Sequence, residues 1–187
     1  MATLIYSASC SLDGYVEDED GSFEFARPDE EILAFVNESL RPVGTFLLGR
    51  RMYDTMLYWE SADPLTDPSR ATRDFAEIWR TAEKVVFSRT LDEVTAPRSR
   101  LEREFNPAVI RQMMDDSKRD LCIGGAEIAG LAMWSGLVDE VRLLVTPAIV
   151  GGGRPALPAK VRRYLELLEH RRFDGGVVYL RYRLTGG

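Results

Sequence analysis

The sequence predicts an α/β fold: a mixed, mostly parallel sheet flanked by helices, with an antiparallel hairpin at the C-terminal end. Two observations predict it. Apolar strand-like runs alternate with amphipathic helical runs along most of the chain, as in parallel sheets, where a helix usually returns the chain to the start of the next strand. The last two runs, 165–173 and 177–184, flank Asp174-Gly175-Gly176, which is typical of a hairpin turn.

The composition favours one domain over residues 1–187 whose partners are small molecules. With 187 residues, 45% of them hydrophobic, the chain can bury a sizeable core. Its net charge of -6 disfavours a nucleic-acid backbone or an anionic membrane as partner. No apolar run approaches the roughly 18 residues that span a bilayer, and the N-terminus lacks a signal-peptide pattern. We therefore expect a cytoplasmic location.

The first third of the chain predicts a strand, a helix and a second strand. Residues 3–12 form an apolar run that stops at the turn dipeptide Asp13-Gly14. After an acidic loop, Pro28 and the carboxylates that follow it favour a helix start, because proline suits the first turn and negative charge stabilises the positive end of the helix dipole. Residues 45–48 form a short buried strand that leads into a helix starting at 49–51.

The rest of the chain continues the alternation. The proline-containing stretch 61–69 is expected to be a loop, and the spacing of Phe75, Ile78 and Trp79 predicts a helix after it. The elements that follow are strand 84–88, polar segment 90–99, helix 107–114, strand 121–123, helix 126–135 and strand 141–150. Gly136 is placed to end the last of these helices.

Cysteine and histidine are too few for several common chemistries. Cys10 and Cys122 lie far apart in apolar runs and are expected to be buried, reduced thiols. His170 stands in a charged stretch, as a surface residue would. One histidine and two separated cysteines do not make a Cys/His zinc site, so no metal is expected. Catalysis of the Ser-His-Asp or Cys-His type would depend on His170, which has no supporting motif.

Three predicted strand ends share one design. The segments 48–51, 87–90 and 123–126 each pass from an apolar strand into glycine, hydroxyl or arginine residues. In open α/β sheets ligands bind outside the carboxyl ends of the strands, where glycine lets a phosphate approach backbone N–H groups and arginine matches phosphate oxygens. Taken singly, the glycines can be tight turns and the arginines solvated surface charges. Together they favour a phosphate-rich ligand, although neither the G-x-G-x-x-G fingerprint nor a P-loop is present.

With these segments in view, the chain resembles the dihydrofolate reductase-like family, in its bacterial branch akin to the riboflavin-biosynthesis reductase C-terminal domain. The matching segments cover nearly the whole chain in family order. They are Ser11-Leu12-Asp13-Gly14-Tyr15, Leu48-Gly49-Arg50-Arg51-Met52-Tyr53, residues 84–91, Ile123-Gly124-Gly125-Ala126-Glu127, and Gly136 to Arg142 through Gly151-Gly152-Gly153.

The resemblance implies that NADPH binds in an extended pose across the sheet. Each part of the cofactor would then meet one matched segment. The implied contacts are Gly49, Arg50, Arg51 and Met52 along the phosphates, Ser88, Arg89 and Thr90 at the adenosine 2′-phosphate, Ile123, Gly124, Gly125, Ala126, Glu127 and Ile128 around the pyrophosphate, and Ala8, Ser9 and Val16 near the nicotinamide.

The resemblance also implies two catalytic candidates. Dihydrofolate reductases carry a carboxylate at the start of the first helix, and a threonine on a neighbouring strand shares its hydrogen-bond network. Here Glu31 matches the carboxylate and Thr146 the threonine. Asp29 and Glu30 compete with Glu31, and all three have an alternative role as surface acids at the helix dipole. A partly buried Glu31 would have a raised pKa and could assist protonation of the product.

Four residues are candidates for substrate contact. Asp13 either touches substrate or holds the turn before Gly14. The aromatic residues Phe23, Tyr53 and Trp59 either line the substrate pocket or pack in the core. Phe23 stands in the loop where the family usually has a tryptophan, which this sequence lacks there.

These residues lead to one main functional hypothesis and two rivals. The main one is hydride transfer from NADPH to a small planar heterocycle of the pterin or pyrimidine kind, or to a carbonyl. The first rival is a module of the same fold that binds NADPH or another nucleotide without efficient catalysis. The second is a structural protein that self-associates through a sheet edge and binds no nucleotide. A homodimer is expected by resemblance.

Overall fold

A single eight-stranded sheet organises the part of the chain that the computed structural model describes, residues 1–61 and 69–185. Its strands, in chain order, are β1 (Leu4–Cys10), β3 (Val43–Gly49), β4 (Glu83–Phe87), β5 (Ser99–Glu102), β6 (Asp120–Gly124), β7 (Glu140–Val145), β9 (Tyr164–Arg172) and β10 (Val178–Thr185). They lie in the order β5-β4-β3-β6-β1-β7-β10-β9. The strands from β5 to β7 are parallel, and β10 is antiparallel to both of its neighbours. The predicted mixed sheet with a C-terminal hairpin is confirmed.

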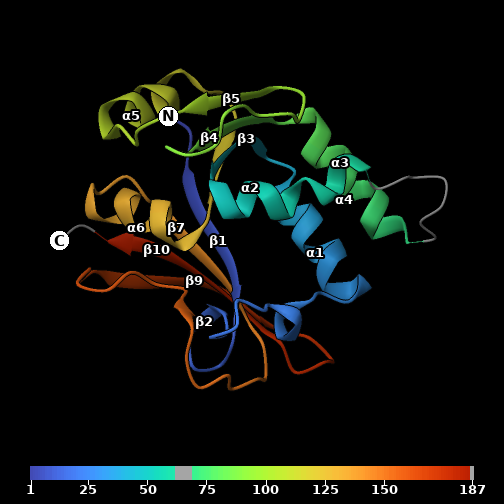
Figure 1. Cartoon of the computed structure of the whole chain (residues 1–187). Coiled ribbons are helices and arrows are strands. Elements are labelled where there is room, and N and C mark those ends of the chain that lie inside the picture. Colours follow the sequence, from blue (N-terminus) through green and yellow to red (C-terminus); the bar gives the residue numbers. More distant parts are fainter. Residues whose placement is uncertain (62–68, 186–187) are drawn as a thin grey trace.

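Helices cover both faces of this sheet (Figure 1). They are α1 (Glu30–Leu40), α2 (Arg50–Met56), α3 (Tyr58–Ser61), α4 (Arg70–Thr81), α5 (Pro107–Asp116) and α6 (Ala126–Trp134), with a 3-10 turn η1 (Glu24–Ala26). Buried side chains of α1 and α4 form one core layer against the sheet, and those of α5 and α6 form the other. None of the helices in the described ranges is long and apolar enough to cross a membrane.

The helix starts follow from capping side chains. Asp29 accepts a hydrogen bond from Ile32 N at 2.9 Å, and Ser69 accepts one from Thr72 N at 3.1 Å. Asn106 caps α5, whose first residue is Pro107. The predicted end of α6 is confirmed as well, because Gly136 has a φ of 64°, which glycine adopts without strain.

Two apolar layers explain why the central strands are continuous apolar runs. In β1, Leu4 and Tyr6 belong to the layer under α5 and α6, whereas Ile5 between them belongs to the layer under α1 and α4. Successive side chains of a strand point to opposite faces, so a strand buried on both faces needs apolar residues throughout. The sheet therefore presents its ends, rather than its faces, to ligands.

Some predicted bounds are wrong. The strand expected at 141–150 ends at Val145, because Pro147 has no N–H to offer a ladder and Gly151 has a φ of 80°. The chain instead forms a small separate sheet from β2 (Tyr15–Glu17) and β8 (Arg154–Pro155), which the sequence did not reveal. Of the loop expected at 61–69, residues 62–68 lie outside the described residues.

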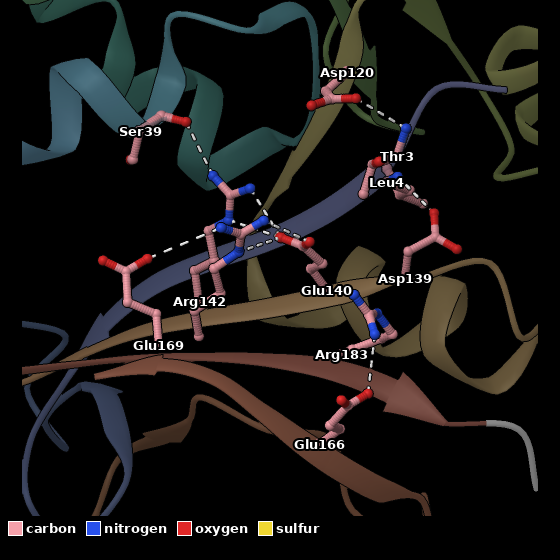
Figure 2. A network of polar contacts seen from close by, with 11 residues as sticks. Thr3, Leu4, Ser39, Asp120, Asp139, Glu140, Arg142, Glu166, Glu169 and Arg183 are labelled. Atoms are coloured by element: carbon pink, nitrogen blue, oxygen red, sulfur yellow. Dashed lines mark hydrogen bonds and ion pairs between the residues drawn. The ribbon is translucent and has the colours of Figure 1, made fainter. Parts of the chain in front are cut away.

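A buried polar network ties the sheet to α1 at the end opposite the strands' carboxyl ends (Figure 2). Glu140 and Arg142 at the start of β7 are each only 8% exposed. Their side chains lie 2.8 Å apart, and Arg142 also donates to Ser39 O at 3.0 Å. Arg181 of β10 donates to the other carboxylate oxygen of Glu140 at 2.8 Å. The Glu140 carboxylate thus links β7 to β10 through Arg181, and to α1 through Arg142.

Candidate functional site

The three strand ends singled out in the sequence lie next to one another. β3 pairs with β4 through Gly49 and Phe87, and with β6 through Leu48 and Gly124. Because these strands are parallel, their carboxyl ends reach the same edge of the sheet. The segments that follow, including Ser88 after β4, therefore begin at that edge. The structure brings the predicted phosphate-binding segments together.

Glycine is required where two of these segments touch. A Cβ atom at Gly125 would lie 3.6 Å from Gly49 N, and Gly125 has a φ of 104°. A Cβ atom at Gly124 would lie 3.1 Å from Cγ of Met52. The turn after β6 thus packs directly on the turn after β3. This agrees with the tight-turn interpretation of the two glycines, and it also leaves backbone rather than side chains at the edge.

The start of α6 offers backbone N–H groups. Gly125 is its N-cap residue, and no side chain of the described residues caps this end. The first N–H groups of a helix lack intrahelical partners and attract anions. Ile123 and Ile128 have their side chains in the core, so they can meet a ligand only through their backbone. Ala126 is half-buried, whereas Glu127 is exposed.

Three exposed arginines surround this edge. Arg50 donates to Oγ1 of Thr90 at 2.6 Å and lies 3.6 Å from Asp54, so it bridges α2 and the segment after β4. Arg51 lies 3.5 Å from Glu17. Arg89 has no ion pair or hydrogen bond within the described part of the chain. Exposed guanidinium groups with weak or no pairing can turn to an anionic ligand at low cost.

Ser88 shapes the turn that carries Arg89 and Thr90. Its side chain is buried, and its Oγ accepts hydrogen bonds from Thr90 N at 3.2 Å and Leu91 N at 3.0 Å. Such a side-chain-to-backbone pattern fixes a turn locally. Arg89 and Thr90, both exposed, are held at the edge beside Arg50.

The small sheet of β2 and β8, which we call the β2–β8 flap, lies beside β1. Ala8 and Ser9 at the end of β1, and Val16 in β2, are half-buried. Gly153 lies so close to the flap that any Cβ atom there would overlap the carbonyl oxygen of Glu17. Arg154 follows directly, 3.1 Å from Glu17 and 3.4 Å from Glu127.

Sequence reasoning missed this ion network. The signal that could have found Arg154 is an arginine immediately after three glycines. Nothing in the sequence pairs it with Glu17, because the two are 137 residues apart. The network links the β2–β8 flap to α2 through Arg51 and to α6 through Glu127.

The catalytic pair implied by the resemblance is not assembled. The Glu31 side chain is 48% exposed and lies 3.2 Å from Arg171 of β9, so it is not the partly buried carboxyl that was expected. Thr146 is buried and donates to Cys10 O at 3.1 Å. No hydrogen bond joins Glu31 to Thr146 among the residues described. The expectation of one shared network is therefore wrong.

Some of the four candidates for substrate contact have a structural role instead, and the others stay candidates. Asp13 accepts hydrogen bonds from Val150 N at 3.2 Å and Gly151 N at 2.8 Å, so it ties the turn before Gly14 to the loop after β7. A hydrogen bond from Ser11, together with these backbone bonds, lowers the pKa of the Asp13 carboxyl. Phe23 is exposed before η1 and stays a candidate.

Tyr53 is a core residue, whereas Trp59 is half-buried. Tyr53 is 1% exposed, and its hydroxyl accepts hydrogen bonds from the backbone of residues 95 and 96. Trp59 packs on Phe75 of α4 with ring centroids 4.4 Å apart. The expectation of substrate contact is wrong for Tyr53, because the segment after β4 covers its hydroxyl. For Trp59, which is half-buried, it stays a prediction.

Comparisons with known proteins agree with this geometry. The profile of the family described as RibD C-terminal domain matches residues 2–179. The uncharacterized protein YyaP of Bacillus subtilis (strain 168) is 27% identical over 186 residues, which cover 98% of this chain and 95% of that protein. A putative riboflavin biosynthesis protein from Shewanella sp. PV-4 is similar over 100% of both chains, with a TM-score of 0.77 and 20% identity.

A dihydrofolate reductase from Enterococcus faecalis, solved in complex with NADP(H) and RAB-propyl, has the same fold. Its TM-score is 0.65 at 13% identity, over 98% of this chain and 97% of that one. The dihydrofolate reductase-like fold expected from the strand-end segments is thereby confirmed. At these identities the structural likeness speaks for the fold alone.

Proposed function

The chain belongs to the RibD C-terminal domain family, and on that premise we propose that it is an NADPH-dependent reductase. Its substrate would be a small planar heterocycle of the pterin or pyrimidine kind, or a carbonyl compound. One observation carries the proposal: the ends of β4, β3 and β6 converge at one edge that is lined by glycine backbone and exposed arginines. A fold relative is known in complex with NADP(H).

The residues at this edge fit a phosphorylated dinucleotide. The uncapped N-terminus of α6, within the described ranges, supplies N–H groups for a pyrophosphate. Arg50, Arg51 and Arg89 supply guanidinium groups. When bound, NADPH supplies the hydride. The chain's own task is to orient the cofactor and keep water from the reacting atoms.

Two arginines, Arg89 after β4 and Arg50 after β3, favour NADPH over NADH. The 2′-phosphate is the group that distinguishes the two cofactors, and it carries negative charge. Arg89 is exposed, and Arg50 contacts Thr90 beside it. Two cations on neighbouring segments, Arg50 at the start of α2 and Arg89 after β4, match one phosphate group.

A second candidate function has an observation in its favour. Because Glu31 is exposed and paired with Arg171, no carboxylate among these candidates is placed as a buried proton donor. This favours a module that binds NADPH or another nucleotide without efficient catalysis. The two candidates share the cofactor site and differ only in turnover.

Binding and turnover can be tested in sequence. Thermal unfolding with NADPH at about 100 times its dissociation constant should show about 2.7 kcal/mol of added stability. Absorbance at the nicotinamide band, followed with pterins, pyrimidines, flavins and quinoid compounds, then separates the reductase from the module. Oxidation of NADPH by one substrate class supports the reductase; binding with no oxidation across the panel supports the module. If NADPH does not change the thermal stability of the chain, both candidate functions are excluded.

The state of the thiols supports the compartment that we propose, the cytoplasm. Cys10 and Cys122 are both free and buried. Burial raises the pKa of both thiols, that of Cys122 to about 12, so neither is a reactive thiolate at neutral pH. Free thiols are kept reduced in the compartment that also maintains glutathione. For its partner we propose a second copy of the chain.

A further inference from the structure

The segment that joins β4 to β5 is unusual for a parallel connection. The two strands run in the same direction, so residues 88–98 carry the chain back from the end of β4 to the start of β5. Such crossovers normally contain a helix, whose backbone groups satisfy one another. This one contains no helix. Its N–H and C=O groups must therefore find other partners.

Arg103, just beyond β5, holds the first part of this crossover. Its guanidinium donates to three backbone carbonyls, those of Ser88 at 3.3 Å, Leu91 at 2.5 Å and Asp92 at 3.4 Å. A planar fork with several donors is suited to gathering carbonyl groups that face one point. The carbonyls on both sides of Arg89 and Thr90 are thus fixed by one side chain.

Tyr53 of α2 holds the second part. Its buried hydroxyl accepts hydrogen bonds from Thr95 N at 2.8 Å and Ala96 N at 2.9 Å. Lys84, whose side chain is fully buried, donates to Pro97 O at 3.1 Å. The crossover is therefore tied to α2 on one side and to β4 and β5 on the other.

These ties set the distance between two groups of the proposed cofactor site. Arg50 lies at the start of the helix that contains Tyr53, and Thr90 lies within the part of the crossover that Arg103 holds. Arg50 and Thr90 meet at 2.6 Å. If the crossover moved relative to α2, the segment that carries Arg89 and Thr90 would move away from Arg50, and a phosphate could not be shared between the two arginines.

We propose that Arg103 and Tyr53 are positioning residues that give the site its preference for the 2′-phosphate, without touching the cofactor. This inference rests on the proposed function of the same site. It assigns the discrimination between NADPH and NADH to the whole clamped crossover rather than to Arg89 alone.

The test uses Arg103→Ala and Arg103→Lys, with Arg100→Ala as the matched control. Arg100 lies in β5, is exposed and pairs with Glu102, and its side chain makes no hydrogen bond or ion pair with the crossover in the described part of the chain. Dissociation constants for NADPH and NADH are measured for each protein. Arg103→Ala should lower the ratio of NADPH to NADH affinity by about tenfold, since several hydrogen bonds from a charged group are lost. Arg103→Lys should lower it nearly as far, because it keeps the charge but loses the fork.

Tyr53→Phe gives a second, independent variant. It keeps the buried ring and removes only the hydroxyl, so the fold is preserved if Arg103→Ala proves too damaging. Amide hydrogen exchange over residues 88–97 reports the clamp itself and needs no cofactor. Faster exchange in this segment, together with a lower affinity ratio, is the expected result for both Arg103 variants and for Tyr53→Phe; Arg100→Ala should change neither.

Three results would overturn the inference, and they are distinguishable. If the unmodified chain prefers NADPH and the variants keep that preference while exchange rises, the clamp is only structural and the proposed function stands. If the unmodified chain binds neither nucleotide, the proposed function fails and this inference fails with it. The inference is also overturned if Arg100→Ala lowers the ratio of NADPH to NADH affinity as much as Arg103→Ala does. The loss of one positive charge would then explain the effect.

Discussion

Arg89 is the one arginine of the site that the described part of the chain leaves without an ion pair or hydrogen bond. Replacing it with alanine should weaken NADPH binding by about tenfold or more, because a charge-assisted contact to phosphate is worth about 1.5–3 kcal/mol. NADH, which has no 2′-phosphate, should bind almost as before. Titration of both cofactors checks this, with Arg100→Ala as control. Equal losses for the two cofactors would remove the assignment of Arg89 to the 2′-phosphate.

Glu17 competes with the proposed ligand for two arginines. Its carboxylate lies 3.5 Å from Arg51 and 3.1 Å from Arg154, so it partly neutralises the cationic edge. Glu17→Gln should therefore tighten NADPH binding by about threefold at low salt, because pairs of this exposure contribute about 0.2–1 kcal/mol each. The gain should shrink as salt is added.

Glu19→Gln is the control for this change. Glu19 lies in the same acidic loop and has no ion pair in the described ranges. An equal gain from both variants would show that only net charge matters. If Glu17→Gln instead binds NADPH more weakly, the ion network matters more for holding the flap in place than for competing with the ligand.

At the scale of whole elements, the polar network at the start of β7 should govern stability in acid. Burial alone would raise the pKa of Glu140, but hydrogen bonds from Arg181 and Arg142 outweigh it and hold that pKa below its ordinary value. A carboxyl whose folded pKa is lowered stabilises the fold above its unfolded pKa, and this contribution is lost as the pH falls through the folded pKa. The fold should therefore weaken below about pH 4.5.

Glu140→Gln tests this role. At about pH 7 it should lower the free energy of unfolding by about 3 kcal/mol, because two arginines lose their buried counter-charge. The difference from the unmodified chain should narrow as the pH falls through the lowered pKa of Glu140, because its carboxyl then becomes neutral like the glutamine. Urea unfolding over this pH range is the measurement.

Glu166→Gln, on the neighbouring hairpin of β9 and β10, is the matched control. Glu166 pairs with Arg183 at 3.0 Å, and both side chains are more than half exposed (Figure 2). Loss of the Glu166 charge should lower the free energy of unfolding by less than about 1 kcal/mol at any pH. A comparable cost for the two variants would contradict a special role for the buried network.

The elements also show how far sequence reasoning reaches. Strands buried on both faces, such as β1, and helices with capping residues, such as α1 behind Asp29, were predicted because their signals are local. β8 was missed because its two residues pair with β2, which lies far away in sequence. The crossover after β4 carries no local pattern at all, since its order comes from Tyr53 and Arg103.

The candidate site likewise has parts that could be predicted from the sequence and parts that could not. The glycine and arginine segments could be predicted because parallel strands bring their carboxyl ends to one edge, wherever the strands lie in the sheet. Glu31 could not be placed, because its helical position leaves open which neighbour it meets. That neighbour is Arg171, which belongs to the final hairpin.

At the scale of the whole molecule, charge is divided unevenly between the sheet and its last hairpin. The chain as a whole carries -6, yet β9 and β10 contain four arginines, Arg171, Arg172, Arg181 and Arg183, against two glutamates, Glu166 and Glu169. β9 is also the last strand in the sheet order. One edge of the molecule therefore differs in charge from the rest.

This edge has the features of a self-association surface. β9 is nine residues long, and no strand of the described residues pairs with its outer side. Leu165 and Leu167 are 42% and 49% exposed, and they face the same side of the hairpin as Leu184 and Tyr182, their cross-strand partners. Long edge strands with exposed apolar side chains readily pair with another chain. In a two-fold dimer the same strand would meet its own copy.

Sedimentation at about 100 μM should accordingly give twice the 21.1 kDa of one chain. Leu167→Lys places a charge in the apolar band and should shift the protein to the monomer, because edge lysines oppose strand pairing. Val109→Lys is the control, since Val109 is 48% exposed on α5, away from this edge. If the Leu167→Lys variant is still a dimer, the interface lies elsewhere. If the unmodified chain is a monomer, the proposed dimer is excluded. If cofactor affinity is the same in the Leu167→Lys monomer, each chain holds a complete cofactor site, as expected from an edge at β3, β4 and β6 that lies away from β9.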